Sequence, residues 1–317
     1  MTENIEKGNK KNFWCTVMEL FKEIELSDKE WVDEIVFKED SPSADFNFPN
    51  LYVWDKVFQQ LICKHGDRML TELIHEGENV FSFPIGTGPL RPAIEFMREH
   101  AGSKNNSFII KSITDKHREM LEAEYPGQFE YSEDPGLNDY VYFVERLATY
   151  PGRSLHGKKN CCNRFQAAND WDFLPFTKDF IPECELMLDR WFSENAERVD
   201  DGIVNERRAM RRAFDAFDEL KLEGGVLRSS GTIVAFTLGT IINHDTYDVM
   251  FEKALMSYDG SYPMVCREMC RMLMAKYPHI KYTNREDDMG LDYLRMSKMS
   301  YKPEYILSKY IARWKND

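Results

Sequence analysis

Hydrophobic and polar positions alternate over short stretches in the first half of the chain. Apolar or alternating runs at 58–63, 69–74 and 80–83 are separated by the glycine-bearing segments 65–67 and 76–78. Short alternating runs between such turns are typical of antiparallel strands. The pattern therefore predicts a meander of three strands.

The sequence predicts helices both before and after that meander. A Ser-x-x-Glu pattern starting at Ser27 predicts a helix start before Trp31, because a serine at this position caps the first turn. Apolar residues at spacings of three and four predict helices over 89–100 and 114–124, with a strand at 108–113 between them.

The second half also mixes helices and strands, and it has no low-complexity linker. Its patterns predict helices and strands in the following order: helices at 154–169, 179–196 and 203–220, strands at 225–228, 232–242 and 247–253, a helix at 262–277, a strand at 280–284, a helix at 290–299 and a strand at 305–314. We therefore expect a mixed α/β protein of two units, each a mixed sheet flanked by helices. The Pro-Gly pair after Tyr150 predicts a boundary between domains 1–150 and 151–317.

Composition narrows the class of protein. The 317 residues are 43% hydrophobic and 30% charged, which is ordinary for globular chains. The longest nearly uncharged apolar run, 231–243, is shorter than the roughly 20 residues that span a bilayer, and the polar start has no signal-peptide core. We expect a cytoplasmic protein without integral membrane insertion. The seven cysteines read as reduced thiols, and no metal site is expected, because Cys266 and Cys270 have no further ligands at zinc spacing.

The negative charge is concentrated in one half. Residues 1–150 hold 16 Lys and Arg against 28 Asp and Glu, a net of −12, whereas residues 151–317 hold 25 against 26, a net of −1. A strong negative field opposes encounter with phosphate polymers. We therefore expect no DNA partner.

Three polar segments in the second half carry candidate chemistry. The first joins a strand to a helix, and its glycine-bearing loop places backbone N–H groups where a pyrophosphate can bind, although an ordinary strand-to-helix turn explains the same pattern. The loop lacks the glycine spacing of nucleotide and dinucleotide sites. Its residues are Ser257, Tyr258, Asp259, Gly260 and Ser261.

The second segment packs charges between a strand and a helix. Asp287 and Asp288 stand where carboxylates cap a helix. Asn284 and Arg285 precede them at the strand end, where they can orient a polar acceptor, and Glu286 can serve as a general base. A solvated run of charges is the equally simple alternative.

The third segment is a basic helical face. Arg295, Lys298 and Lys302 recur at spacings of three and four, so they can hold an anion or form a solvated stripe. Tyr301 can donate a proton to a leaving group, or pack its ring with the hydroxyl at the rim. The window 151–169 is also basic, which suits a phosphorylated ligand or contact with the acidic first half.

Five segments, 44–54, 139–165, 251–262, 284–291 and 294–303, resemble in the same order an uncharacterised bacterial family. That family is grouped with the C-terminal domain of phosphatidylglycerol lysyltransferases. The resemblance implies two tandem GNAT-like acyltransferase domains, a fold also found in Fem-type aminoacyltransferases, with the active cleft in the second domain. The membrane-embedded portion and the catalytic motif of the lysyltransferases have no counterpart in the quoted segments.

The resemblance implies transfer of an acyl group to an amine or a lipid headgroup. The donor is acyl-CoA or an aminoacyl-tRNA, and we favour CoA, because a chain of net charge −13 repels a polyanion. A degenerate binding or sensor protein for a CoA-like or nucleotide-like ligand is the alternative of a different class. On the GNAT-like pattern the pyrophosphate of CoA is expected at 257–261.

Amine attack requires a proton acceptor and a group that assists the leaving thiolate or alkoxide. We expect Glu286 or Glu252 as the base and Tyr301 as the acid. The expected ligands of the substrate are polar or cationic residues of the same segments: Lys253, Asn284, Arg285, Arg295 and Lys298.

Overall fold

The computed structural model describes residues 21–196 and 201–315 and divides into two compact units. Within the described residues, unit 1 consists of 21–25, 55–132 and 310–315. Unit 2 consists of 26–54, 133–196 and 201–309. Helix α3 (Phe48–Phe58) runs from unit 2 into unit 1. In the described residues no helix combines the length and apolar composition that a bilayer crossing needs.

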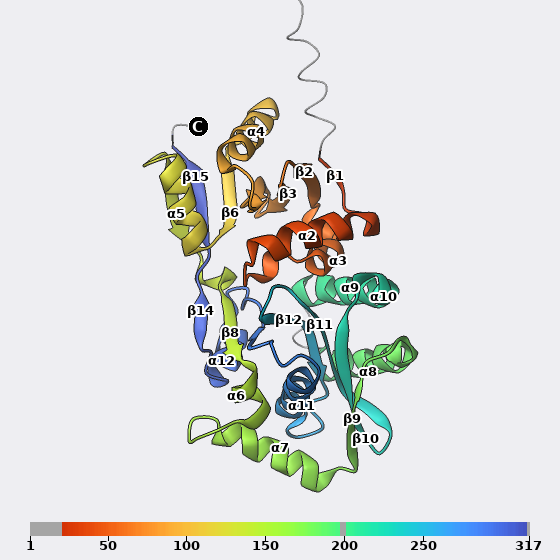
Figure 1. The fold of residues 1–317 in the computed structure, drawn as a ribbon. Coiled ribbons are helices and arrows are strands. Elements are labelled where there is room, and N and C mark those ends of the chain that lie inside the picture. Colours follow the sequence, from red (N-terminus) through yellow and green to blue (C-terminus); the bar gives the residue numbers. More distant parts are fainter. Residues whose placement is uncertain (1–20, 197–200, 316–317) are drawn as a thin grey trace, which may run out of the picture. The chain divides into compact units, whose positions relative to one another are not determined.

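Unit 1 is an eight-stranded sheet with two helices (Figure 1). Its elements are β1 (Lys22–Glu23), β2 (Leu61–His65), β3 (Arg68–His75), β4 (Glu78–Ser82), β5 (Ile85–Gly86), β6 (Ile109–Ile113), β7 (Phe129–Glu133), β15 (Tyr310–Trp314), α4 (Leu90–Ser103) and α5 (Asp115–Glu124). β2, β3 and β4 pair antiparallel, which confirms the meander expected from the alternating pattern. β6 joins parallel to β4 after the crossover through α4.

Unit 2 contains a seven-stranded sheet in the order β14-β8-β13-β12-β11-β10-β9. The strands are β8 (Asp139–Phe143), β9 (Trp171–Pro175), β10 (Glu223–Ser229), β11 (Thr232–Ile241), β12 (Thr246–Ala254), β13 (Tyr282–Asn284) and β14 (Tyr305–Leu307). The helices are α2 (Lys29–Glu39), α6 (Val144–Thr149), α7 (His156–Ala168), α8 (Ile181–Glu194), α9 (Asp201–Asp215), α10 (Phe217–Leu220), α11 (Ser261–Lys276) and α12 (Asp292–Ser300). β11 is an interior strand, and β10 pairs antiparallel to it.

The compact units do not divide the chain at residue 150. β8 pairs with β13 and β14, and α6 packs against α11, so the segment before Tyr150 is part of unit 2. The strand expected at 305–314 is two strands, β14 in one sheet and β15 in the other. Hydrogen bonds between segments far apart in the sequence decide which sheet and which unit a strand belongs to. A local apolar pattern carries no information about such distant partners.

The core of unit 2 lies between its sheet and α6, α7 and α11. Tyr142, Tyr150 and Phe165 are among the largest fully buried side chains there. Cys266 and Cys270 of α11 are buried free thiols, in agreement with the expected reduced state.

Gly239 of β11 lies very close to β12, the strand that bears part of the candidate site. The register between β11 and β12 shifts between Leu238 and Thr240, and a Cβ built on Gly239 lies 1.8 Å from the carbonyl oxygen of Asp248. Real Cβ atoms do not come this close to a backbone oxygen, so only glycine fits without moving β12.

We predict that Gly239→Ala lowers the free energy of unfolding by about 2 to 3 kcal/mol, because the added methyl forces the two strands apart. Gly157→Ala is the control, since its Cβ meets nothing within 4 Å and alanine favours α7. Urea denaturation followed by circular dichroism measures both variants. Equal stability of the Gly239 variant and the unmodified chain would contradict the close approach.

Candidate functional site

The candidate site lies where the pairing between β12 and β13 ends. β12 continues to Ala254, but β13 pairs with it only along 246–248. Glu252 stands on the later part of β12, and Arg285 directly follows β13. The Arg285 Nη2 lies 2.7 Å from Glu252 Oε1, so an ion pair joins the two segments beyond their backbone pairing.

The Arg285 guanidinium has unused hydrogen-bonding capacity. Its side chain is 13% exposed, and Nη1 is buried without a hydrogen-bond partner among the described residues. The guanidinium carbon lies 4.6 Å from the centroid of the Tyr301 ring and 5.8 Å from that of Tyr142. Aromatic faces attract cations, which keeps the guanidinium in place while Nη1 is left for another acceptor.

Glu252 is the partner carboxylate, and its side chain is 9% exposed. Burial raises the pKa of Glu252, and the positive charges of Arg285 and Lys298 offset part of that rise. A carboxyl group with a raised pKa is a stronger base than an exposed one once it is ionised.

A second pair of carboxyl groups meets through Asn50. Its Nδ2 lies 3.0 Å from Asp248 Oδ2 and 2.9 Å from Glu286 Oε1. Asn47 Nδ2 also donates to Asp248 Oδ2, at 3.0 Å. Burial raises the pKa of both carboxyl groups well above the ordinary range, and the neighbouring Asp248 raises that of Glu286 further. The surroundings of these two groups therefore disfavour their ionised forms.

Lys298 and Tyr301 complete the cluster. Lys298 Nζ donates to the carbonyl oxygens of Arg285 and Glu286, the latter at 3.2 Å, and so supports the left-handed backbone of Glu286 (φ 57°). Tyr301 is buried, and burial raises the pKa of its hydroxyl well above the ordinary range, so this group keeps its proton.

Lys158 of α7 approaches the same ring. Its Nζ lies 3.6 Å from the Tyr301 centroid. Burial lowers the pKa of Lys158, and the positive charge of Arg285 lowers it further. We call Glu252, Arg285, Lys298, Tyr301 and Lys158 the transfer cluster.

Asn284 supports the cluster from a buried polar network. Its Nδ2 donates to Asp139 Oδ2 at 2.9 Å and to the carbonyl of Pro42 at 2.8 Å, and its Oδ1 accepts from the Glu286 N–H at 2.7 Å. Lys309 Nζ in turn lies 2.7 Å from Asp139 Oδ1. With every amide atom of Asn284 engaged, we assign this residue to positioning the 284–286 turn.

Arg295 is also engaged within the chain. Its Nε and Nη2 contact the two oxygens of Asp288 at 2.9 and 3.2 Å, and the Tyr140 hydroxyl donates to the same carboxylate at 2.6 Å. Burial alone raises the pKa of Asp288, but the hydrogen bonds from Arg295 and Tyr140 outweigh it, so the pKa is lowered. The pair fixes the start of α12.

Lys253 lies outside the transfer cluster. Successive residues of a strand point to opposite faces. Lys253 Nζ contacts Glu206 of α9 at 2.7 Å and lies 4.4 Å from the centroid of the Trp191 ring of α8, whereas Glu252 faces Arg285.

In the loop between β12 and α11, several of the donors expected for a pyrophosphate are engaged within the chain. The Glu194 carboxylate accepts from the Met256 N–H at 3.1 Å and from the Ser257 hydroxyl at 2.7 Å. The N–H groups of Tyr258 and Ser261 donate to carbonyls of the loop itself. Asp259 adds a further carboxylate, paired with Arg164. Gly260 takes a left-handed conformation (φ 84°), and a Cβ there would lie 2.3 Å from the Cys161 carbonyl oxygen. Backbone conformation and close packing therefore explain why this position is a glycine.

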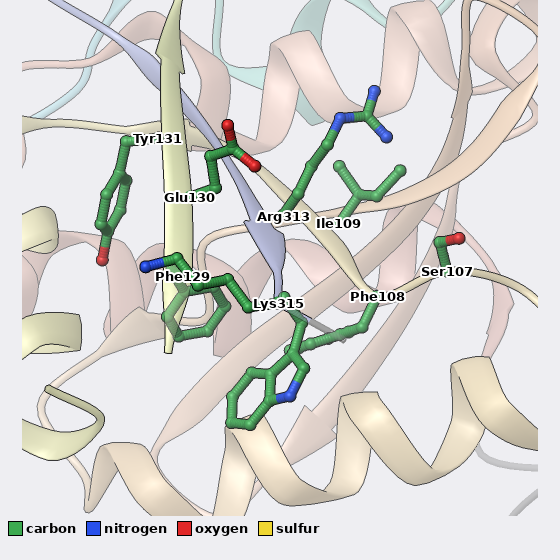
Figure 2. A pocket seen from close by; sticks show the side chains of 9 residues that line it. Ser107, Phe108, Ile109, Phe129, Glu130, Tyr131, Arg313 and Lys315 are labelled. Carbon is green, nitrogen blue, oxygen red and sulfur yellow. The ribbon is translucent and has the colours of Figure 1, made fainter. Parts of the chain in front are cut away.

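A cavity of about 810 Å³ lies elsewhere, in unit 1 at the ends of β6, β7 and β15 (Figure 2). Its basic side chains are already engaged, since Arg313 pairs with Glu78 and Lys315 donates to the Gly127 carbonyl. The Trp314 ring is packed against Phe129 and Arg98. We therefore take the transfer cluster, rather than this cavity, as the candidate site. Among the described residues no group of acidic, cysteine or histidine side chains is arranged to hold a metal ion.

Sequence reasoning missed four members of this arrangement: Asp248, Asn47, Asn50 and Lys158. Asn47 and Asn50 lie in the segment 44–54 that carried the family resemblance, and Lys158 lies in the basic window 151–169. Asp248 had no local signal, because it reads as one polar residue within an alternating strand.

Comparison with known proteins places this architecture among characterised folds. A conserved protein of unknown function from Bacteroides thetaiotaomicron is 34% identical, with a TM-score of 0.88 and coverage of 93% of this chain and 99% of that one. The C-terminal domain of a putative lysylphosphatidylglycerol synthetase from Agrobacterium fabrum (13% identity, TM-score 0.64, 90% and 91% coverage) and FemX (9%, 0.62, 93% and 97%) share the fold. An uncharacterised protein of Mycoplasmoides gallisepticum is 23% identical over 210 residues, and the chain spans 65% of its length.

A tandem GNAT protein from a clavulanic acid biosynthesis pathway (10% identity, TM-score 0.50, 92% and 98% coverage) also shares the fold, so the expected tandem GNAT-like fold is confirmed. The model of the family "Phosphatidylglycerol lysyltransferase, C-terminal" matches residues 39–313, which contain every residue of the transfer cluster. The chain therefore belongs to the phosphatidylglycerol lysyltransferase C-terminal family.

Proposed function

We propose that this protein transfers an aminoacyl group from an aminoacyl ester, such as that of a charged tRNA, to an amine or a lipid headgroup. Membership of the lysyltransferase family and the fold shared with FemX support aminoacyl transfer in general. The observation that carries the proposal is the Glu252–Arg285 pair. It brings a buried carboxylate of raised pKa together with a guanidinium whose Nη1 is unpartnered.

In the proposed reaction Glu252 takes the proton from the attacking N–H or O–H of the acceptor. The acceptor atom forms a bond to the ester carbonyl carbon, and Arg285 Nη1 donates to the oxyanion that develops on that carbonyl. The bond from this carbon to the ribose oxygen then breaks, and the Tyr301 hydroxyl supplies a proton to the leaving oxygen. Proton transfer from Glu252 back to Tyr301 restores the starting state.

The geometry of the 257–261 loop favours an ester donor over acyl-CoA. A pyrophosphate placed there would meet the Glu194 and Asp259 carboxylates. Like charges at hydrogen-bond distance repel one another, although solvent screens them at this exposed loop. We therefore now favour the aminoacyl-tRNA donor over the CoA donor expected from net charge.

A sensor without turnover is the second candidate. Glu252 is satisfied by Arg285, and both side chains are largely buried. A protein that only binds would keep this pair closed, whereas a transferase must let the acceptor reach Glu252. Turnover therefore separates the two candidates.

We predict that Glu252→Gln lowers kcat by about 10² to 10⁴, because the amide cannot accept the proton. The assay mixes labelled total aminoacyl-tRNA with phosphatidylglycerol vesicles or soluble amines and follows transfer of the label. Glu206→Gln is the matched control, since it breaks a 2.7 Å ion pair on the other face of β12 and should leave kcat unchanged. No transfer by the unmodified chain with any acceptor would favour the sensor instead.

The proton held by Glu286 predicts a pH effect on stability. Its folded pKa is raised above 4.5, so the folded state binds this proton more tightly than the unfolded chain. The stabilisation that the protonated Glu286 contributes is complete below about pH 4.5 and is lost as the pH rises through the folded pKa of the group. Glu286→Gln should therefore gain stability relative to the unmodified chain as the pH rises above about 4.5 toward the folded pKa of Glu286.

Urea denaturation across that range measures the difference in free energy of unfolding between the two proteins. The exposed Glu145, changed to Gln, is the control and should show a constant difference. A difference that does not vary with pH for Glu286→Gln would mean that Glu286 is ionised throughout, and would make it a rival to Glu252 as the base.

A further inference from the structure

One face of α12 exposes large apolar side chains to solvent. Met296 is 73% exposed, and Met289, Tyr293 and Met299 are between 42% and 59% exposed. Their spacings of four, three and three residues place them along one side of the helix and of the turn that precedes it. No residue of α12 is buried. We call these four residues the α12 strip.

The other face of α12 belongs to the candidate site. Lys298 donates to the carbonyl oxygens of Arg285 and Glu286, and Arg295 pairs with Asp288. Polar contacts therefore hold one face of the helix against unit 2, while the apolar face stays largely exposed. Exposed apolar residues are normally scattered over a protein surface, and a contiguous group of them marks an interaction site.

Charges of opposite sign lie near the two ends of α12. Asp292 stands at its start, with a side chain that is 93% exposed and has Arg295 as its ion-pair partner at 3.9 Å. Lys302 follows the end of the helix, is exposed, and pairs with no carboxylate of the described chain. A second α12 that lies antiparallel to the first brings Asp292 of each copy beside Lys302 of the other. The strip and its flanking charges are therefore complementary to themselves.

We propose that the α12 strip is the interface of a homodimer, in which two copies of α12 pack antiparallel about a two-fold axis. In such an interface the same surface patch serves on both copies. Met296 then lies near the axis against Met296 of the second copy, and Tyr293 faces Met299 of the second copy. Methionine and tyrosine are enriched in protein interfaces, and methionine sulfur packs well against aromatic rings. The inference goes beyond the proposed function and does not depend on it.

The position of Asp292 favours a second copy over a lipid surface. Asp292 lies seven residues before Met299 and thus on the same side of the helix as the strip. A bilayer that covered the strip would have to take up this carboxylate, whereas helices that bind membranes keep their charges on the opposite face. In the dimer the same carboxylate meets Lys302 of the second copy.

The size of the strip limits the strength of the association. A standard interface buries roughly 800 Å² on each partner and uses about 20 residues a side. The strip with its flanking charges is smaller than that. We therefore expect a dimer that dissociates at micromolar concentration rather than an obligate one.

Sedimentation equilibrium of the full chain over micromolar concentrations measures the association. We expect a monomer–dimer equilibrium that is weakened about tenfold or more in Met296→Glu, because two carboxylates then meet at the axis. Leu186→Glu is the matched control, since Leu186 of α8 is 66% exposed and lies outside the strip. This variant should associate as the unmodified chain does.

Charge reversal tests the antiparallel arrangement. Asp292→Lys and Lys302→Asp should each weaken the dimer, because each single change brings like charges together. The double variant should restore it, because the charges are again opposite. Weakening by both single changes without rescue in the double variant overturns the arrangement.

A chain that stays monomeric at every concentration, or a dimer that Met296→Glu leaves unchanged, overturns the proposal. Co-sedimentation with vesicles of phosphatidylglycerol and phosphatidylcholine separates the other occupant. Vesicle binding by a monomeric chain that is lost in Met296→Glu would assign the strip to a lipid surface and would also overturn the dimer. Thermal unfolding of every variant distinguishes a lost interface from a lost fold.

Discussion

The early end of the β12–β13 pairing is the constraint on which the candidate site depends. Three residues of β13 pair with a nine-residue β12, and the remaining length of β12 is joined to the following segment by side chains instead. The Glu252–Arg285 ion pair supplies that connection. A buried ion pair contributes little net stability, but removing one partner leaves an uncompensated charge. The pair therefore fits a functional role better than a purely structural one.

Two buried carboxyl groups near this pair differ from Glu252 in what surrounds them. Glu252 faces a guanidinium, whereas Asp248 and Glu286 meet through the amide of Asn50. Opposite charge favours the ionised form, whereas burial and a like charge favour the neutral form. On this basis we propose Glu252 as the base, while the surroundings of Asp248 and Glu286 favour their neutral forms.

The sequence predicted most elements, because period and turn chemistry are local. Glu252, Arg285, Lys298 and Tyr301 do lie together in unit 2. The sequence could also have predicted that Lys253 lies outside the transfer cluster, because the neighbour of Glu252 on a strand must face the other way. The contact of Glu194 with the 257–261 loop could not be predicted, because a carboxylate about sixty residues upstream gives no sign of which loop it will contact. The strands β7 and β9 lack a buried alternating face, so their pattern gave no signal.

The central claim is that the chemistry takes place at the Glu252–Arg285 pair in unit 2. The most direct test is a crystal structure of the protein soaked with a non-hydrolysable aminoacyl-adenosine amide, which mimics the end of a charged tRNA. The account predicts that the amide carbonyl lies within hydrogen-bond distance of Arg285 Nη1, with the carbonyl carbon close enough to Glu252 for an attacking group to fit between them. Occupation of the 257–261 loop or of the cavity in unit 1, with the ion pair undisturbed, would contradict it.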